Sequence, residues 1–328
     1  MSFTTVERQP PRLNRSQLFC PGVRPALFEK AATGDADVIC LDLEDSVAPA
    51  DKPQARANVI QALKTQNFGT KSISVRINGL DTQWCYRDVV DIMEQAGERL
   101  DLIMIPKVGV PADVYAIDML VSQIEMAVGR KKPVKFEVII ESVHGLNNCE
   151  AIAGSSKRLE SLHFGSADYA ASAGMRTTNI GGSNRDYVVL TDADGNGKRD
   201  THWSDLWHYS AFRMVAAARA HGLRPIDGPF GDYSDEAGFI AQAKRSAVLG
   251  CEGKWAIHPS QVAPANQVFT PPADEVERAE AILAAMKDGA QKGMGAVALK
   301  GKLIDLASIR QAEVIVGQMR MIRERTKS

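Results

Sequence analysis

Short apolar runs alternate with helix-like segments along most of this chain, and this alternation limits the folds that it can adopt. From residue 17 onward, eight runs rich in β-branched residues have the character of strands: 17–20, 37–43, 72–77, 102–105, 135–140, 159–164, 223–226 and 253–257. Segments with helical periodicity separate them, at 25–32, 53–64, 86–95, 112–128, 146–153, 206–221 and 235–249. Eight strand–helix units predict an α/β fold, a (β/α)8 TIM barrel closed by a further helix near 260–269.

The alternative for the same pattern is a doubly wound open sheet. Such a sheet binds its ligand at a switch-point crevice, and the sequence shows no glycine-rich dinucleotide motif to accompany one. We therefore predict a barrel domain at 15–270 after an N-terminal extension at 1–14. The prolines at 271 and 272 mark a boundary. Beyond it, residues 271–328 are expected to form a C-terminal helical lid segment that packs on the barrel or on a neighbouring subunit.

Composition narrows the partners of this chain. Its 328 residues are 45% hydrophobic and 24% charged, with a formal net charge of −1. This balance gives no reason to expect nucleic acid or an anionic membrane, so an anionic ligand must be met by a local group of basic residues. Five scattered cysteines without a C-x-x-C pair indicate free thiols. With no apolar signal segment and no run long enough to span a bilayer, we expect a cytoplasmic protein.

Two acidic residues stand where apolar runs end. Glu141 closes the run at 135–140, and Asp168 follows the run at 159–164. In a parallel barrel the carboxyl ends of neighbouring strands meet at one mouth, where such folds place their chemistry. Two carboxylates there form half of an oxygen-rich site for a divalent cation, typically Mg²⁺, with water and substrate completing it. The alternative is that each acid only caps the helix that follows.

Further charged residues follow the second, third and fourth strands. Asp42 and Glu44 alternate onto one face, where two acids near a metal would hold its water ligands. Arg76 offers a planar guanidinium that never deprotonates, which suits a carboxylate or a developing oxyanion. Lys107 follows the fourth strand. The alternative for Arg76 and Lys107 is a structural ion pair with the acids of the same mouth.

Several motifs resemble those of the citrate lyase β-subunit-like family, within the HpcH/HpaI aldolase superfamily. They are Leu41-Asp-Leu-Glu-Asp-Ser-Val-Ala-Pro-Ala-Asp-Lys52, Val75-Arg-Ile-Asn-Gly-Leu-Asp-Thr82, Met104-Ile-Pro-Lys-Val108, Glu137-Val-Ile-Ile-Glu141 and Gly165-Ser-Ala-Asp168. Others resemble the malyl-CoA and β-methylmalyl-CoA lyases in particular: Asp227-Gly-Pro-Phe-Gly-Asp232, Gly253-Lys-Trp-Ala-Ile-His-Pro259 and Gly301-Lys-Leu-Ile-Asp-Leu-Ala-Ser308. The likeness extends over nearly the whole chain.

This resemblance implies a carbon–carbon lyase that depends on Mg²⁺, with Mn²⁺ as an alternative ion. It would cleave (S)-malyl-CoA reversibly to acetyl-CoA and glyoxylate, and related members act on β-methylmalyl-CoA or citramalyl-CoA. One rival hypothesis keeps the fold and ends in thioester hydrolysis. Another is a carrier-dependent subunit of a larger lyase complex. The resemblance also implies a homo-oligomer, a trimer or hexamer.

The resemblance assigns roles to individual residues. Glu141 and Asp168 would hold the metal, and Arg76 would stabilise charge on the substrate, with Glu44 beside it as a further catalytic group. The backbone amides of Ala167 and Asp168 would bind the glyoxylate carboxylate. Asp305 would exchange a proton with the enolate carbon from a neighbouring subunit, whereas the sequence alone makes it the N-terminal acid of the last helix.

Basic residues near the first two strand–helix units are the candidates for the phosphates of CoA. They are Arg15, Arg24, Lys30 and Lys52. The alternative is that some are scattered, solvated cations. Two other features invite a functional reading. His258 is expected to shape the pocket rather than to catalyse, and the run 192–197 resembles half of a calcium loop but lacks its final glutamate, so a polar turn is expected.

Overall fold

The structure is a computed structural model that describes residues 6–291, 296–299 and 301–326. The chain divides into two compact units. The first comprises Met1–Pro10 and Asn14–Asn266, and the second comprises Pro11–Leu13 and Gln267–Ser328. The first unit contains the eight predicted strand–helix repeats and the residues Glu141 and Asp168. Asp305 belongs to the second unit.

The first unit is an eight-stranded parallel barrel, as the sequence predicts. Its strands follow one another around the sheet in chain order: β1 (Ser16–Pro21), β2 (Val38–Asp42), β3 (Ser72–Arg76), β4 (Leu102–Ile105), β5 (Lys135–Ile140), β6 (Leu159–Phe164), β9 (Arg224–Ile226) and β10 (Lys254–Ala256). All neighbouring pairs are parallel. The strands form because their β-branched and apolar residues are buried on both faces, between the barrel interior and the surrounding helices.

Two residues close the barrel between β9 and β10, the strands at the two ends of the sheet order. Asp227, directly after β9, forms a parallel bridge with Lys254 of β10. Their side chains form a buried ion pair, with 2.7 Å between Lys254 Nζ and Asp227 Oδ2, and the same ammonium donates to the carbonyl of Gly228. The barrel is therefore sealed by a backbone bridge and by a paired charge.

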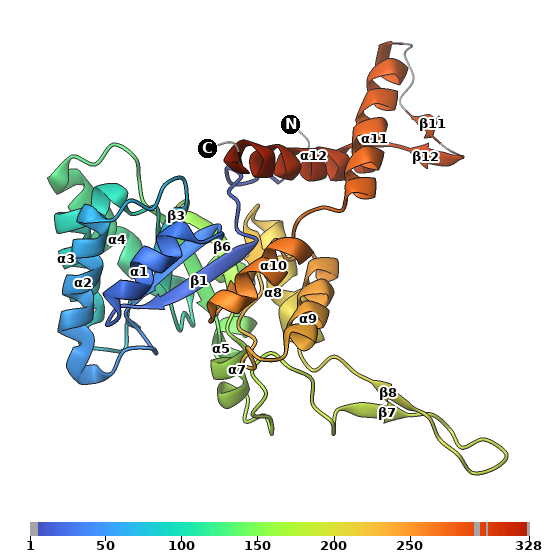
Figure 1. Ribbon diagram of the computed structural model, residues 1–328, viewed down its shortest axis with the longest axis horizontal. Helices are drawn as coiled ribbons and strands as arrows, with labels where there is room; N and C mark the ends of the chain where they lie inside the picture. Colours follow the sequence, from blue (N-terminus) through green and yellow to red (C-terminus); the bar gives the residue numbers. More distant parts are fainter. Residues whose placement is uncertain (1–5, 292–295, 300, 327–328) are drawn as a thin grey trace. The chain divides into compact units, whose positions relative to one another are not determined.

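Helices cover the outside of the barrel. They are α1 (Pro25–Thr33), α2 (Lys52–Thr65), α3 (Cys85–Ala96), α4 (Pro111–Val128), α5 (Val143–Asn147), α6 (Cys149–Ala153), α7 (Ser166–Ser172), α8 (His208–Ala220), α9 (Glu236–Leu249) and α10 (Val262–Val268). Figure 1 shows α1 to α4 grouped on the outer side of strands β1 and β3. Prolines begin α1 and α4, whereas Ser142 and Asp235 cap α5 and α9 with their side-chain oxygens.

A β-hairpin that the sequence reading did not predict lies between α7 and α8. Its strands are β7 (Val188–Leu190) and β8 (Thr201–Trp203), and they pair antiparallel. It projects away from the barrel (Figure 1). The calcium-like run forms its turn, where Asp194 Oδ1 accepts from the backbone amides of Asn196 and Lys198. The run therefore folds as the expected polar turn.

The second unit contains two long helices and a short hairpin. These are α11 (Ala273–Gln291), β11 (Val297–Leu299), β12 (Lys302–Ile304) and α12 (Leu306–Thr326). Its own small core joins Ala279, Ile282 and Met286 of α11 to Ile304 and Ala312. The two long helices agree with the helical segment expected from the sequence, and the short hairpin of β11 and β12 was not predicted. Among the described residues, no helix is long and apolar enough to cross a bilayer.

Candidate active site

Glu141 and Asp168 lie at the carboxyl-terminal ends of adjacent strands. Glu141 directly follows β5, is buried, and accepts a hydrogen bond from the Lys107 backbone amide at 2.6 Å. Asp168 lies in the first turn of α7, after β6. Gly165 between them permits their close approach, because a Cβ atom there would stand 2.7 Å from Glu141 Oε2. The predicted metal ligands therefore share one part of the barrel mouth.

The electrostatics of this pair call for a cation. Burial, with the negative charges of Glu44 and Asp168, raises the pKa of Glu141 to about 8. One further polar atom, Ser166 Oγ at the start of α7, is buried without a hydrogen bond to any described residue. Crowded carboxylates and an unused hydroxyl oxygen are what a hydrated divalent ion binds, so the residues fit Mg²⁺.

The protein alone does not supply a complete ligand set. Within the described part of the chain, no group of three or more His, Cys, Asp or Glu side chains is arranged to hold a metal. Glu141 and Asp168 would therefore contribute two positions, and water and substrate oxygens would fill the others. This agrees with the way Mg²⁺ binds through one or two carboxylates and keeps several waters.

Arg76 is fixed at its edge by carboxylates. Its Nε and Nη2 atoms donate to the two oxygens of Asp42, each at 2.7 Å. Nη1 lies 2.9 Å from Glu44 Oε2 and 3.4 Å from Asp45 Oδ2. Burial opposes the ionisation of Asp42, but the paired guanidinium of Arg76 outweighs it and holds the pKa of Asp42 below its usual range. The predicted placement of Asp42 and Glu44 on one face is confirmed, since both contact the same guanidinium.

Lys107 contacts both Glu44, which is paired with Arg76, and Glu141, the predicted metal ligand. Its Nζ lies 2.5 Å from Glu44 Oε1, while its backbone amide binds Glu141. Its φ of 55° is in the left-handed region, which is uncommon for a side-chain-bearing residue and is found at functional sites. Burial, partly offset by Arg76 and Lys107, raises the pKa of Glu44 to about 6. Sequence reasoning found Lys107 by its position but did not predict its backbone contact.

The four CoA candidates divide into two pairs. Arg24 caps the start of α1 and Lys30 lies on the same helix, and both are exposed. Arg15 precedes β1 and is paired with Asp37, which precedes β2, at 2.8 Å. This ion pair lies at the opposite end of the barrel from Glu141, which argues against a phosphate contact for Arg15.

Lys52 is also committed elsewhere. Its side chain is buried, and its ammonium donates to the carbonyls of Leu43 and Glu44 at 2.8 and 2.7 Å. Burial, only partly offset by nearby acids, lowers its pKa. These contacts hold the loop after β2 that carries Glu44 and Asp45. Lys52 therefore stabilises the conformation of this loop. Arg24 and Lys30 remain the candidates for binding the phosphates of CoA.

Asp305 belongs to the second unit. It is exposed and stands immediately before α12, where its Oδ1 accepts from the backbone amide and hydroxyl of Ser308 at 3.0 and 3.1 Å. The hydrogen bond from the Ser308 amide, and to a smaller extent that from its hydroxyl, lowers the pKa of Asp305. The helix-terminal position expected from the sequence alone is confirmed. Its catalytic role stays a prediction.

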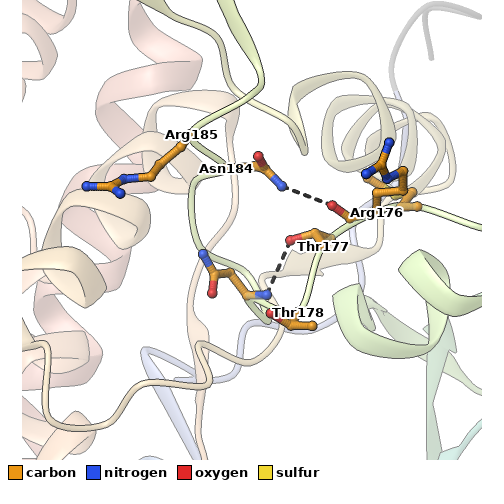
Figure 2. Close-up of a pocket in the computed structure, with 7 residues that line it drawn as sticks. Arg176, Thr177, Thr178, Asn184 and Arg185 are labelled. Carbon is orange, nitrogen blue, oxygen red and sulfur yellow. Dashed lines mark hydrogen bonds between the residues drawn. The ribbon is translucent and has the colours of Figure 1, made fainter.

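Two further features of the first unit lie outside this cluster. His258 follows β10 and stacks on Tyr233, with ring centroids 4.7 Å apart, while its Nδ1 contacts Ser260. A separate hollow follows α7 (Figure 2). Arg176 and Arg185 stand on opposite sides of it with their side chains directed apart, so it does not present a convergent anion site. It is lined by Met175, Arg176, Thr177, Thr178, Asn179, Asn184 and Arg185.

Comparison with known proteins identifies the family. Residues 15–259 match the model of the HpcH/HpaI aldolase/citrate lyase family. The chain belongs to this family. The matched span covers the barrel from just before β1 to the residues after β10, so it includes Arg76, Glu141 and Asp168. The family that the motifs indicate is thus confirmed.

Members of the HpcH/HpaI aldolase/citrate lyase family resemble the chain over most of its length. The L-malyl-CoA/β-methylmalyl-CoA lyase of Cereibacter sphaeroides is 60% identical over 322 residues, 98% of this chain and 99% of that protein. The malyl-CoA/β-methylmalyl-CoA/citramalyl-CoA lyase of Chloroflexus aurantiacus is 42% identical over 287 residues, 87% of this chain and 81% of that protein. A crystal structure of CitE from Mycobacterium tuberculosis, in complex with magnesium, acetoacetate and coenzyme A, has a TM-score of 0.67 and 25% identity, covering 93% and 97% of the two chains.

Proposed function

We propose that this chain is a Mg²⁺-dependent carbon–carbon lyase that cleaves (S)-malyl-CoA reversibly to acetyl-CoA and glyoxylate. It would also cleave β-methylmalyl-CoA to propionyl-CoA and glyoxylate. One observation carries the proposal: Glu141, Asp168 and Arg76 gather at one barrel mouth in a chain 60% identical to an L-malyl-CoA/β-methylmalyl-CoA lyase. The CitE structure with magnesium and coenzyme A supports the same cofactor and the same class of substrate.

Glu141 and Asp168 are the residues that would hold the metal. When bound there, Mg²⁺ supplies Lewis acidity that polarises the oxygen becoming the aldehyde of glyoxylate. Glu44, whose two oxygens are held by Arg76 and Lys107, would orient a water beside the metal. The amides of Ala167 and Asp168 lie in the first turn of α7, where no helical carbonyl accepts from them, so they are free to bind the glyoxylate carboxylate.

Arg76 would stabilise the other product while it forms. When the carbon–carbon bond of malyl-CoA breaks, the electron pair of that bond stays with the thioester fragment, which becomes an enolate. A guanidinium that Asp42 already holds in place needs no reorganisation to meet this charge. Asp305 would deliver a proton to the enolate carbon in cleavage and remove one in condensation. The hydroxyl proton lost from malyl-CoA thus balances the proton gained by the new methyl group.

We also propose how the protein works in the cell. Asp305 would act from the second unit of a neighbouring subunit, which requires a homo-oligomer such as a trimer or hexamer. Arg24 and Lys30 would contact the phosphates of CoA, since Arg24 is exposed at the start of α1 and Lys30 is exposed in the last turn of the same helix. A cytoplasmic location is supported by the CoA substrate and by the five buried, unpaired cysteines, which suit a reducing compartment.

The decisive test is a product assay with (S)-malyl-CoA. The protein is incubated with Mg²⁺ or with excess EDTA, and glyoxylate, acetyl-CoA, free CoA and malate are measured. We expect glyoxylate and acetyl-CoA in equal amounts, only with Mg²⁺. Free CoA and malate would identify a thioesterase instead. No turnover by the purified chain, with activity restored by added partner subunits, would identify a carrier-dependent subunit.

A further inference from the structure

Three buried side chains and the partly buried Phe19 connect the barrel interior to Arg76. We call Glu137, His163, Trp255 and Phe19 the barrel column. At its base, Glu137 of β5 accepts from Ser74 Oγ at 2.6 Å and from Gln17 Nε2 at 2.9 Å. Burial works to raise the pKa of Glu137, but the hydrogen bonds of His163, Ser74 and Gln17 lower it below its usual range. The column therefore starts from an ionised carboxylate.

His163 has its ring proton placed by its neighbours. Trp255 Nε1 lies 2.8 Å from His163 Nδ1, and an indole nitrogen can only donate. Nδ1 must then be the unprotonated, accepting nitrogen. The proton of the neutral ring is on Nε2, which lies 2.9 Å from Ser161 Oγ and 3.3 Å from Glu137 Oε1. The imidazole is thus held as a neutral Nε2–H tautomer, with both nitrogens used.

Trp255 and Phe19 form the upper end of the column. Their rings are 4.4 Å apart, and Arg76 Cζ lies 5.2 Å from the Phe19 ring and 6.0 Å from the Trp255 ring. A guanidinium near an aromatic face is attracted by its quadrupole, most strongly where water is excluded. Trp255 is almost wholly buried, at 4% exposure. The buried Trp255 and the partly buried Phe19 therefore give one face of Arg76 an aromatic surface.

Edge and face contacts constrain the guanidinium in different ways. Asp42 binds Nε and Nη2 and Glu44 binds Nη1, and these in-plane contacts resist movement within the plane of the guanidinium more than they resist tilting of that plane. A ring surface against the face limits that tilt. One hydrogen of Nη2 has no partner among the described residues, and the tilt decides where it points. A catalytic hydrogen bond depends on such orientation, because small misplacements lower the rate strongly.

We infer that His163 and Trp255 are positioning residues for Arg76. His163 fixes the Trp255 ring through its Nδ1, and Trp255 with Phe19 fixes the plane of the guanidinium that meets the enolate. This inference rests on the proposed function for its kinetic consequence. Both residues would act through Arg76 rather than by contact with the substrate. Their effect is on kcat rather than on thioester binding.

Substitutions in the column are matched by a control outside it. Trp255→Leu removes the ring surface and the N–H, and Trp255→Phe removes only the N–H. His163→Leu removes the acceptor for Trp255, whereas His163→Asn retains an oxygen near the position of Nδ1. Trp207→Leu is the control, because Trp207 is equally buried and also donates its N–H, to the carbonyl of Gly182. It contacts Phe164 rather than Arg76.

The experiment measures kcat and KM for malyl-CoA cleavage at saturating Mg²⁺, with melting temperatures recorded alongside. We expect Trp255→Leu and His163→Leu to lower kcat at least tenfold, with Trp255→Phe intermediate. Trp207→Leu and His163→Asn should stay within about threefold of wild type, and KM should change less than threefold throughout. An equal loss in Trp255→Leu and Trp207→Leu, a loss confined to KM, or equal losses in both His163 variants would each overturn the inference.

A spectroscopic measurement separates this inference from the proposed function. Imidazole ¹⁵N NMR should show His163 protonated on Nε2 alone, and the Arg76 Nε–Hε resonance should carry a ring-current shift that Trp255→Leu changes. A doubly protonated His163, or an unchanged Arg76 resonance, would overturn the column even in an active lyase. If the wild type cleaves no malyl-CoA, the proposed function fails, and these resonances still decide whether the column positions Arg76.

Discussion

Asp42 and Arg76 are direct cross-strand partners in the β2–β3 register, and their side chains form a two-point ion pair. The two contacts, Nε to Oδ1 and Nη2 to Oδ2, both measure 2.7 Å. The pair is buried, with side-chain exposures of 8% for Arg76 and 1% for Asp42. Because the barrel sets the register, the backbone itself delivers the arginine to the mouth in one orientation. The same ion pair therefore contributes to the stability of the barrel and to the orientation of Arg76, the candidate catalytic residue.

Replacing Asp42 by Asn should damage both. Breaking a buried pair by removing one partner typically costs about 3–5 kcal/mol, because the other charge is left uncompensated. We expect a loss of that order in the free energy of unfolding by urea, together with a fall in kcat. Glu252→Gln is the control, since its pair with Arg219 is partly exposed and is worth at most about 1 kcal/mol. Equal losses in the two variants would show that Asp42 has no special role.

Glu141 makes Mg²⁺ binding depend on pH. Its pKa in the metal-free protein is about 8, so below that pH the ion must displace a proton. The apparent affinity for Mg²⁺ should rise by up to about tenfold per pH unit toward pH 8 and then level off. Calorimetric titration from pH 6 to 9 measures this. Glu141→Gln should bind Mg²⁺ weakly with little pH dependence, and a flat wild-type profile would contradict the raised pKa.

The same group predicts the pH dependence of stability without metal. An unfolded glutamate titrates near 4.5 and the folded Glu141 near 8, so the folded state binds more protons between these values. Stability contributed by the protonated carboxyl is present at low pH and falls as pH rises through 8, by at most about 1.4 kcal/mol per unit. Glu141→Gln should remove this decline. Denaturation in EDTA at pH 6, 7 and 8 checks it, and adding Mg²⁺ should reverse the order.

Asp305→Asn tests the acid–base role of the second unit. Asn retains a side-chain oxygen for the Ser308 amide, so α12 should remain capped. The carboxylate is lost, and turnover should fall by two to four orders of magnitude, the usual range for an acid–base group. Mg²⁺ binding should be unchanged. Glu313→Gln, a change at an exposed acid of the same helix, is the control. Wild-type turnover in Asp305→Asn would remove Asp305 from the mechanism.

The fold and the centre of the site could be predicted because their signals are local. β-Branched runs mark the strands, and parallel strands bring Glu141 and Asp168 to one mouth whatever the loops do. The hairpin at 188–203 was missed because its apolar residues flank a run that was read only as a failed calcium loop. The alternating residues Val188 and Leu190, with Gly195 and Gly197 in the turn, were the available signal for a hairpin.

Other parts of the site depend on contacts that sequence does not record. Lys107 holds Glu141 through its backbone amide in a left-handed conformation, and no side-chain pattern encodes this. Lys52 points inward to two carbonyls although lysine is usually exposed. Arg15 is different, because its place before β1 already assigned it to the end of the barrel away from the mouth. His163 carried no motif, and only the barrel interior shows that it contacts Trp255.

The two classes of basic residue should respond differently to removal. Arg24→Ala and Lys30→Ala should raise KM for malyl-CoA several-fold with little change in kcat, because they contribute binding that is equal in the ground and transition states. Salt should reduce the difference from wild type, since the charges are exposed. Arg15→Ala should instead lower the melting temperature and leave KM unchanged, because it breaks the pair with Asp37 at the far end of the barrel. A raised KM in Arg15→Ala together with an unchanged KM in Arg24→Ala would reverse this assignment and place CoA elsewhere.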